Sequence, residues 1–393
     1  MKGIGQMTTA LTRTIVPGQG DRGSAQRRSS SLIDWIVAEK IASYVAGEGD
    51  AAELTVELAP LAADAAQRVV AYTRLQPVRE LPEPEGISRR EWVAANLRSM
   101  RRMLDPVLDR AGEKLGSPRG ARSLGVSLVS TTEVGIVVGF LAQRVLGQYE
   151  LVLLEEASED NPPRLLFVLP NLSTAVRTLR VPKDEFLTWV TLHEVTHAVQ
   201  FASVPWLQPH MASLISELLR SMELRIDGPR RLRAPSVTEA RRIAGAVRRG
   251  DIIGIFASEG ERETIDRVQA TMAVIEGHAE HVMDAVAPEL LPSLPKLRSA
   301  LDRRRRSQSG RARLLAKLLG LEMKMRQYEQ GKVFCDEIVR RAGTDALVAL
   351  FSGPDALPTL AELSDPVAWL MRMGLPLLAG NERPQLSGGS EAA

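Results

Sequence analysis

The sequence has almost no cysteine and almost no net charge. Cys335 is the one cysteine among 393 residues, so an intramolecular disulfide is excluded and a reducing compartment is compatible with the chain. We expect Cys335 to be a small residue of the core. The 50 basic and 48 acidic side chains leave a formal net charge of only +2, which is too little for the field of a dedicated nucleic-acid binder.

The sequence also lacks an apolar run that could cross a membrane. Its longest apolar stretch, Gly125 to Leu146, is interrupted by serine, threonine, glutamate and glutamine, whereas a spanning helix needs about 20 mostly apolar residues. We expect a buried helix there, with Gly135 and Gly139 at a close helix contact. No secretory peptide is legible after Met1, so we expect a cytoplasmic protein without a membrane partner.

Two runs of arginine are the remaining argument for a nucleic-acid partner. They lie at Arg303 to Arg306 and at Arg230 to Arg233. No aromatic residues interleave with them, and charge runs on helices are usually solvated faces. The sequence therefore predicts no nucleic-acid partner.

The two ends of the chain differ in composition from the part between them. Residues 1–30 mix glycine, serine, arginine and glutamine, and residues 376–393 end in NERPQLSGGSEAA. Neither segment can bury enough apolar surface to offset the entropy lost on ordering, so we expect flexible tails. Residues 31–375 are expected to form a single, mostly helical domain, which a subdomain boundary near 205–262 could divide.

Most of this domain has the periodicity of helices. They are expected at 32–46, 51–74, 89–113, 121–146, 183–203, 211–224, 238–249, 263–286, 296–319, 321–341 and 344–351. Pro288 is expected to end the helix at 263–286. Two apolar runs, Tyr149 to Leu154 and Arg164 to Leu169, flank the breaker Glu159 to Pro163 and predict a hairpin. The predicted fold class is mainly α with a small β-hairpin or sheet beside the helix at 183–203 (α+β).

That helix contains the one motif with an explicit chemistry, the HExxH of LHEVTHAVQF. On a helix bounded by Pro182 and Pro205, His193 and His197 share one face and can bind a single ion at about 2.0–2.1 Å, as in zinc hydrolases. Glu194 lies about 100° round the helix, where it can contact a water on the metal without being a ligand. Glu194 is therefore the candidate general base, with Zn²⁺ as the expected cofactor.

A catalytic zinc site usually needs a third protein ligand besides water. The segment Thr271 to Asp284, TMAVIEGHAEHVMD, concentrates carboxylates and histidines within three helical turns. Glu276, Glu280 and Asp284 share one face of this helix, whereas His278 points about 200° away from Glu276. A carboxylate is thus favoured over an imidazole as the third ligand.

The element EGHAE, from Glu276 to Glu280, resembles the EGxAE of zincins whose third ligand is a glutamate. The resemblance implies Glu276 as a zinc ligand and Glu280 as the acceptor of a ligand-histidine N–H, a partner of the kind that sets the ring tautomer. Glu280 as the direct ligand stays open as the alternative. An insertion at 206–262 separates this element from the HExxH, and its helices could form a lid or a substrate wall.

A wider resemblance covers about Ser31 to Leu375. HEVTHAVQF with the PWL after it, IEGHAEHVMD, the arginine run near 303, QYEQG and Asp365-Pro366 resemble an actinobacterial family of zincin-like proteins. That family is catalogued as hydrolases or as associated with biosynthesis of the deazaflavin coenzyme F-420, a label that does not place the coenzyme in this protein. The resemblance implies that the run at Arg164 could be an edge strand that holds a peptide by strand addition.

The leading hypothesis is a zinc hydrolase, in particular a metallopeptidase, acting on a peptide or protein substrate. His210 and Tyr328 are candidate oxyanion stabilisers. One alternative is a helical scaffold with a closed structural zinc, in which Glu280, His278 or His281 takes the fourth position. Another is an adaptor for a protein or nucleic acid with a vestigial motif. The sequence leaves the oligomeric state open.

Overall fold

The structure is a computed structural model that describes residues 33–49, 56–114, 121–150, 162–226, 259–306 and 321–378. The tail expected at 1–30, most of the one at 376–393 and the helix expected at 238–249 lie outside these residues.

Helices dominate the described part, as the predicted fold class requires. They are α2 (Trp35–Ala46), α3 (Leu58–Thr73), α4 (Arg89–Lys114), α5 (Ala121–Ala142), α6 (Leu169–Leu179), α7 (Lys183–Ser203), α8 (Leu207–Ile226), α11 (Glu259–Leu290), α12 (Leu294–Arg306), α14 (Leu321–Ala342), α15 (Asp345–Leu350), α16 (Leu360–Ser364) and α17 (Pro366–Arg372), with a 3-10 turn at Pro354–Ala356. The motif helix α7 has its predicted bounds. Pro288 does not end α11 but lies in its last turn, where the helix is about to stop and the lost hydrogen bond matters little.

A three-stranded sheet lies beside these helices, in the order β1 (Pro84–Ile87), β3 (Arg164–Val168), β2 (Gly147–Glu150). β2 and β3 are antiparallel, which confirms the predicted hairpin pairing. β1 runs parallel to β3 and was not predicted. Because β3 is hydrogen-bonded on both sides, the expectation that this run is an edge strand open to strand addition was wrong.

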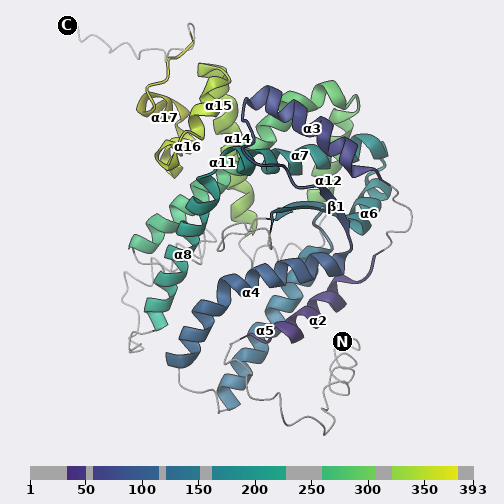
Figure 1. Ribbon diagram of the computed structural model, residues 1–393, viewed down its shortest axis with the longest axis vertical. Coiled ribbons are helices and arrows are strands. Elements are labelled where there is room, and N and C mark those ends of the chain that lie inside the picture. Colours follow the sequence, from purple (N-terminus) through teal and green to yellow (C-terminus); the bar gives the residue numbers. More distant parts are fainter. Residues whose placement is uncertain are drawn as a thin grey trace, which may run out of the picture.

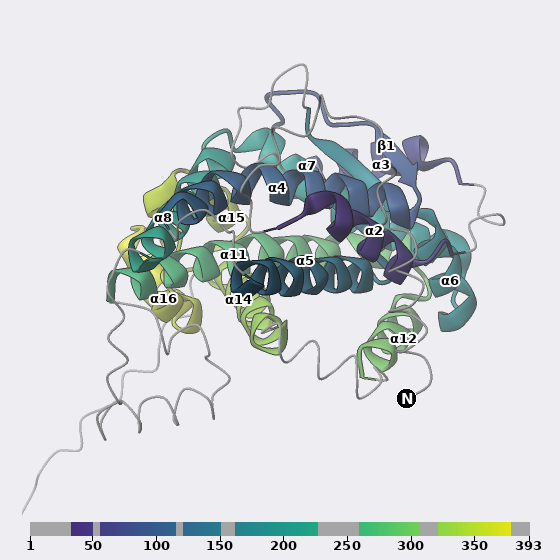
Figure 2. The same cartoon turned by 90° about the horizontal axis from the view of Figure 1, so that it is seen from below.

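The central strand β3 separates two groups of helices. Leu165 and Phe167 pack into a large core shared by α3, α7, α11 and α14, and the alternate residues Leu166 and Val168 pack into a smaller core with α2, α4 and α5. Figure 1 shows α2, α4 and α5 gathered on one side of the molecule, and α2 runs beside α5 in both Figure 1 and Figure 2. The motif helix therefore belongs wholly to the larger core.

Glycines permit two close helix contacts. Gly135 and Gly139 of α5 lie against α2, where a Cβ on Gly139 would come within 2.5 Å of a carbonyl oxygen, so the predicted close contact is confirmed. A Cβ on Gly277 of α11 would lie 2.1 Å from the carbonyl carbon of Gly331 on α14. The backbones of α11 and α14 therefore touch beside Glu276.

Two further expectations concern apolar residues. Across the described ranges, no helix combines the length and the hydropathy needed to cross a bilayer. Cys335 is fully buried in the larger core, as predicted. Burial raises the pKa of its thiol well above the usual value, which keeps the side chain protonated and unreactive.

Candidate metal centre

Three of the predicted site residues meet between α7 and α11. The donor atoms of His193, His197 and Glu276 all lie within 4.8 Å of one another. Nε2 of His193 and Nε2 of His197 are 3.9 and 3.7 Å from Oε2 of Glu276. These separations are too long for hydrogen bonds, but tetrahedral ligands of zinc lie roughly 3.4 Å apart. The three side chains are thus spaced as if around an ion.

Contacts with residues of α7 and α11 orient the ring of His193. The indole of Trp189 is nearly parallel to the ring of His193, with centroids 6.4 Å apart, and Nδ1 of His193 lies 3.2 Å from the sulfur of Met283. The rings of His193 and His197 are nearly perpendicular, at 87°. With Nδ1 turned toward Met283, Nε2 is the nitrogen of His193 that faces Glu276.

The three side chains of the centre differ in burial. The side chain of His197 is 10% exposed, whereas those of His193 and Glu276 are 22% and 26% exposed. Two of the three side chains are therefore partly accessible to solvent. A catalytic zinc site needs such access because its fourth position holds water or substrate.

Glu194 lies beside the three donors but is not one of them. Its carboxylate is buried and accepts a hydrogen bond from the backbone N–H of Tyr149 on β2, at 3.2 Å. A Cβ on Gly147 would come within 2.6 Å of Cγ of Glu194, so β2 can pass over this side chain only with glycine there. Burial, assisted by the charge of Glu276, raises the pKa of Glu194 to about 7, although His197 and the Tyr149 N–H act in the opposite direction.

A hydrogen-bonded glutamine behind His197 was missed by the sequence analysis. Oε1 of Gln200 is 2.9 Å from Nδ1 of His197, and Nε2 of Gln200 lies 3.1 Å from the carbonyl oxygen of Ile275 and 2.8 Å from Nδ1 of His278. Gln200 is completely buried. The sequence did contain a sign of this residue. Gln200 is a polar amide among the apolar residues at the end of α7, three residues after the candidate ligand His197.

Glu280 was predicted to accept a hydrogen bond from a ligand histidine. At His197 that acceptor is Gln200, and for His193 the role of Glu280 stays a prediction. Glu280, on the turn of α11 that follows Glu276, is not in the converging group, which leaves Glu276 as the carboxylate at the centre.

The two histidines named for a closed structural site have other partners. Nδ1 of His278 contacts Gln200, and His281 lies 2.7 Å from Asp336 and 2.8 Å from the hydroxyl of Tyr72. Neither ring belongs to the converging group. In the described part of the chain, these two histidines therefore supply no fourth ligand.

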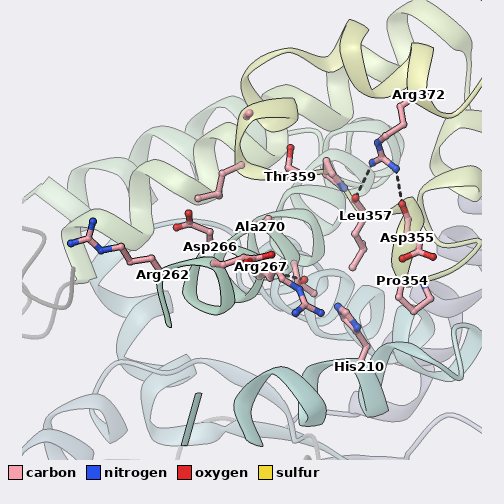
Figure 3. A pocket seen from close by; sticks show the side chains of 15 residues that line it. His210, Arg262, Asp266, Arg267, Ala270, Pro354, Asp355, Leu357, Thr359 and Arg372 are labelled. Carbon is pink, nitrogen blue, oxygen red and sulfur yellow. Dashed lines mark hydrogen bonds between the residues drawn. The ribbon is translucent and has the colours of Figure 1, made fainter. Parts of the chain in front are cut away.

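Of the two candidate oxyanion stabilisers, only His210 has a described side chain, and it contacts a different cavity. His210 lines a separate cavity of about 940 Å³ between α8, α11 and the segment before α16, near Arg267 (Figure 3). The residues lining that cavity include none of the three donors. Tyr328 lies on α14, three residues before Gly331, and its side chain is outside the described part. Both roles stay predictions.

Comparisons with known proteins agree with this picture. The model of a family described as zincin-like metallopeptidase matches residues 33–370. No curated protein matches the chain. A crystal structure from Chloroflexus aurantiacus, described as "a putative hydrolase with a novel fold", is 26% identical with a TM-score of 0.63, and the match covers 87% of this chain and 99% of that one. The actinobacterial grouping and the coenzyme F-420 association stay predictions from resemblance.

Proposed function

Because the chain belongs to the family of zincin-like metallopeptidases, we propose that it is a zinc-dependent peptidase with Glu194 as its general base. The observation that carries the proposal is the convergence of two imidazoles from α7 and one carboxylate from α11. Two histidines and a glutamate are an established ligand set of catalytic zinc. The spacing of the three donors and the partial exposure of the His193 and Glu276 side chains both suit that ion.

The chain's own residues can carry the proton steps. When bound, zinc supplies a water of lowered pKa and a Lewis acid for the scissile carbonyl. Glu194 takes a proton as the water oxygen adds to the carbonyl carbon, and it passes that proton to the departing amine as the C–N bond breaks. The N–H of Tyr149 donates to Oε2 of Glu194 and so restrains the carboxylate that would carry the proton.

The test compares zinc-loaded protein with its Glu194→Gln variant. Each is incubated with a peptide library, and the products are identified by mass spectrometry. We expect the variant to retain zinc and to form no products, because an amide cannot accept the proton. Asp184→Asn is the matched control, since this carboxylate is exposed on the same helix, and it should retain turnover.

Two results would contradict the proposal. One is turnover by Glu194→Gln at the rate of the unchanged protein, which would remove the general base. The other is the absence of zinc from the unchanged protein after dialysis against the metal, which would remove the centre itself.

A further inference from the structure

We propose that Gln200 is a positioning residue that sets the tautomer of His197 for metal binding, and that the Ile275 carbonyl and His278 orient Gln200 in turn. The inference rests on the proposed zinc centre and goes beyond it. It concerns a buried chain of hydrogen bonds that runs from α11 to α7 behind the ring of His197.

The Ile275 carbonyl identifies the two ends of the Gln200 amide. A carbonyl oxygen can only accept, so the amide atom 3.1 Å from it must be the NH₂ group. The oxygen of Gln200 is then the atom that lies 2.9 Å from Nδ1 of His197. Because this oxygen also can only accept, Nδ1 of His197 must carry a hydrogen.

The position of that hydrogen decides which nitrogen can bind a metal. A neutral imidazole with its hydrogen on Nδ1 has its lone pair on Nε2. Nε2 of His197 is the atom that lies 3.7 Å from the Glu276 carboxylate. An inverted Gln200 amide would present NH₂ to Nδ1 and favour hydrogen on Nε2, which would block the ligand atom.

His278 removes the remaining freedom of the amide. The NH₂ group of Gln200 is also 2.8 Å from Nδ1 of His278, which must therefore accept. His278 is completely buried, and its Nε2 has no hydrogen-bond partner among the described residues. An unpaired buried N–H lowers the stability of the fold, so His278 does not serve folding stability. Its hydrogen bond with the NH₂ group of Gln200 explains its presence better.

The same amide also links the two ligand-bearing helices. Ile275 immediately precedes Glu276 on α11, and Gln200 lies on the turn of α7 that follows His197. A single buried side chain thus contacts one ligand directly and the backbone next to another. Loss of Gln200 should therefore disturb both the ring orientation and the spacing of the centre.

The first test needs no substitution. Long-range ¹H–¹⁵N spectra of the metal-free protein report which nitrogen of each of its five histidines carries hydrogen. We expect hydrogen on Nδ1 of His197 and on Nε2 of His278. Hydrogen on Nε2 of His197 would overturn the inference, whether or not the protein binds zinc or cleaves peptides.

The second test measures zinc affinity by competition with a chelator. Gln200→Met removes the acceptor and should weaken zinc binding by about 10–100-fold, as is usual for partners of ligand histidines. Gln200→Glu retains an oxygen that can accept from Nδ1 of His197 but loses the NH₂ group that contacts the Ile275 carbonyl and His278, so it should recover only part of that loss. Thr191→Val is the matched control, because its buried hydroxyl on α7 has no partner among the described residues, and it should leave the affinity unchanged.

The outcomes separate this inference from the proposed function. Equal zinc affinity in Gln200→Met and the unchanged protein would overturn the positioning role but leave the zinc centre intact. Failure of the unchanged protein to bind zinc would instead overturn the proposed function. Should Gln200→Met not fold, the spectra of the unchanged protein still decide the tautomer.

Discussion

Helix α11 contributes to two clusters of histidine and carboxylate, and the distances between the nitrogen and oxygen atoms differ between them. At the metal centre, Glu276 stays 3.9 and 3.7 Å from the nitrogens of His193 and His197. In the second cluster, His281 is 2.7 Å from Asp336 and 2.8 Å from the Tyr72 hydroxyl, so its ring nitrogens are already bonded to protein. The same residue types thus form a site with room for an ion in one place and a closed link in the other.

The second cluster joins helices rather than presenting ligands. Lys332 of α14 lies 2.5 Å from Asp336 and 2.9 Å from Asp284 of α11, and Arg298 of α12 also pairs with Asp284. Every acid in this group therefore has a cationic or imidazole partner. The presence of histidines and carboxylates alone therefore does not identify a metal site. The two clusters differ in the distance between the histidine nitrogens and the carboxylate oxygens.

The largest expected difference is between the zinc affinities of two variants, each with one carboxylate replaced in one of the clusters. Glu276→Gln removes a carboxylate ligand and should weaken zinc binding by more than about 100-fold. Loss of a residue that only hydrogen-bonds to a ligand usually costs no more than that. Asp336→Asn, in the closed cluster, should leave zinc affinity unchanged. Chelator competition measures both. A comparable loss in the two variants would contradict the distinction drawn between the clusters.

The next effect comes from the glycine contact that holds α14 against α11 between the clusters. Gly277→Ala places a Cβ 2.1 Å from the backbone of Gly331, so the helices must separate, at a cost of about 1–3 kcal/mol or more. Gly260→Ala is the control, because nothing lies within 4 Å of its Cβ. It should be neutral or slightly stabilising. Denaturant unfolding measures both, and equal stabilities would show that the contact is not tight.

A smaller effect is expected at the edge of the closed cluster. Tyr72→Phe removes the hydroxyl that contacts His281 and should lower the free energy of unfolding by about 1 kcal/mol. Zinc affinity should not change, because no donor of the metal centre is touched. A loss of zinc binding in this variant would show that the two clusters act as one unit.

The smallest effect concerns Glu337, the partly exposed residue that follows Asp336 on α14. Hydrogen bonds from Arg340, with further help from Arg341, lower the pKa of this carboxyl to about 2, although slight burial opposes them. A pKa lower in the folded than in the unfolded protein means that the pair stabilises the fold above about pH 4.5, and that this stability is lost as the pH falls toward 2. Glu337→Gln should therefore destabilise slightly at pH 7 and not at pH 2. Thermal unfolding at the two pH values checks this, and an equal effect at both would contradict it.

Features that depend on local sequence were predicted well. Helix α7 has the bounds implied by Pro182, its acidic first turn and the Val204-Pro205 stop, because those signals act within a few residues. The convergence of Glu276 with the two histidines was predicted from the chemistry of zinc ligands and from the resemblance of EGHAE to the zincin motif. By contrast, β1 has only four residues, including proline and glycine, and pairs in parallel with a distant strand, so no local pattern reveals it.

The missed part of the site depends on backbone atoms and on tertiary packing. Gln200 is oriented by the carbonyl of Ile275, and a main-chain acceptor leaves no trace in composition or spacing. Helical geometry correctly predicted that His278 points away from Glu276. It could not predict that His278 contacts Gln200, because that contact depends on how α7 packs against α11. The central position of β3 was likewise hidden, because it depends on the unpredicted strand β1.

The most direct measurement is an anomalous difference map at the zinc edge from crystals grown with zinc. We expect one peak bounded by Nε2 of His193, Nε2 of His197 and the Glu276 carboxylate, with a non-protein oxygen in the fourth position. A peak located elsewhere, or an ion whose fourth ligand is a protein side chain, would contradict a zinc centre open for catalysis.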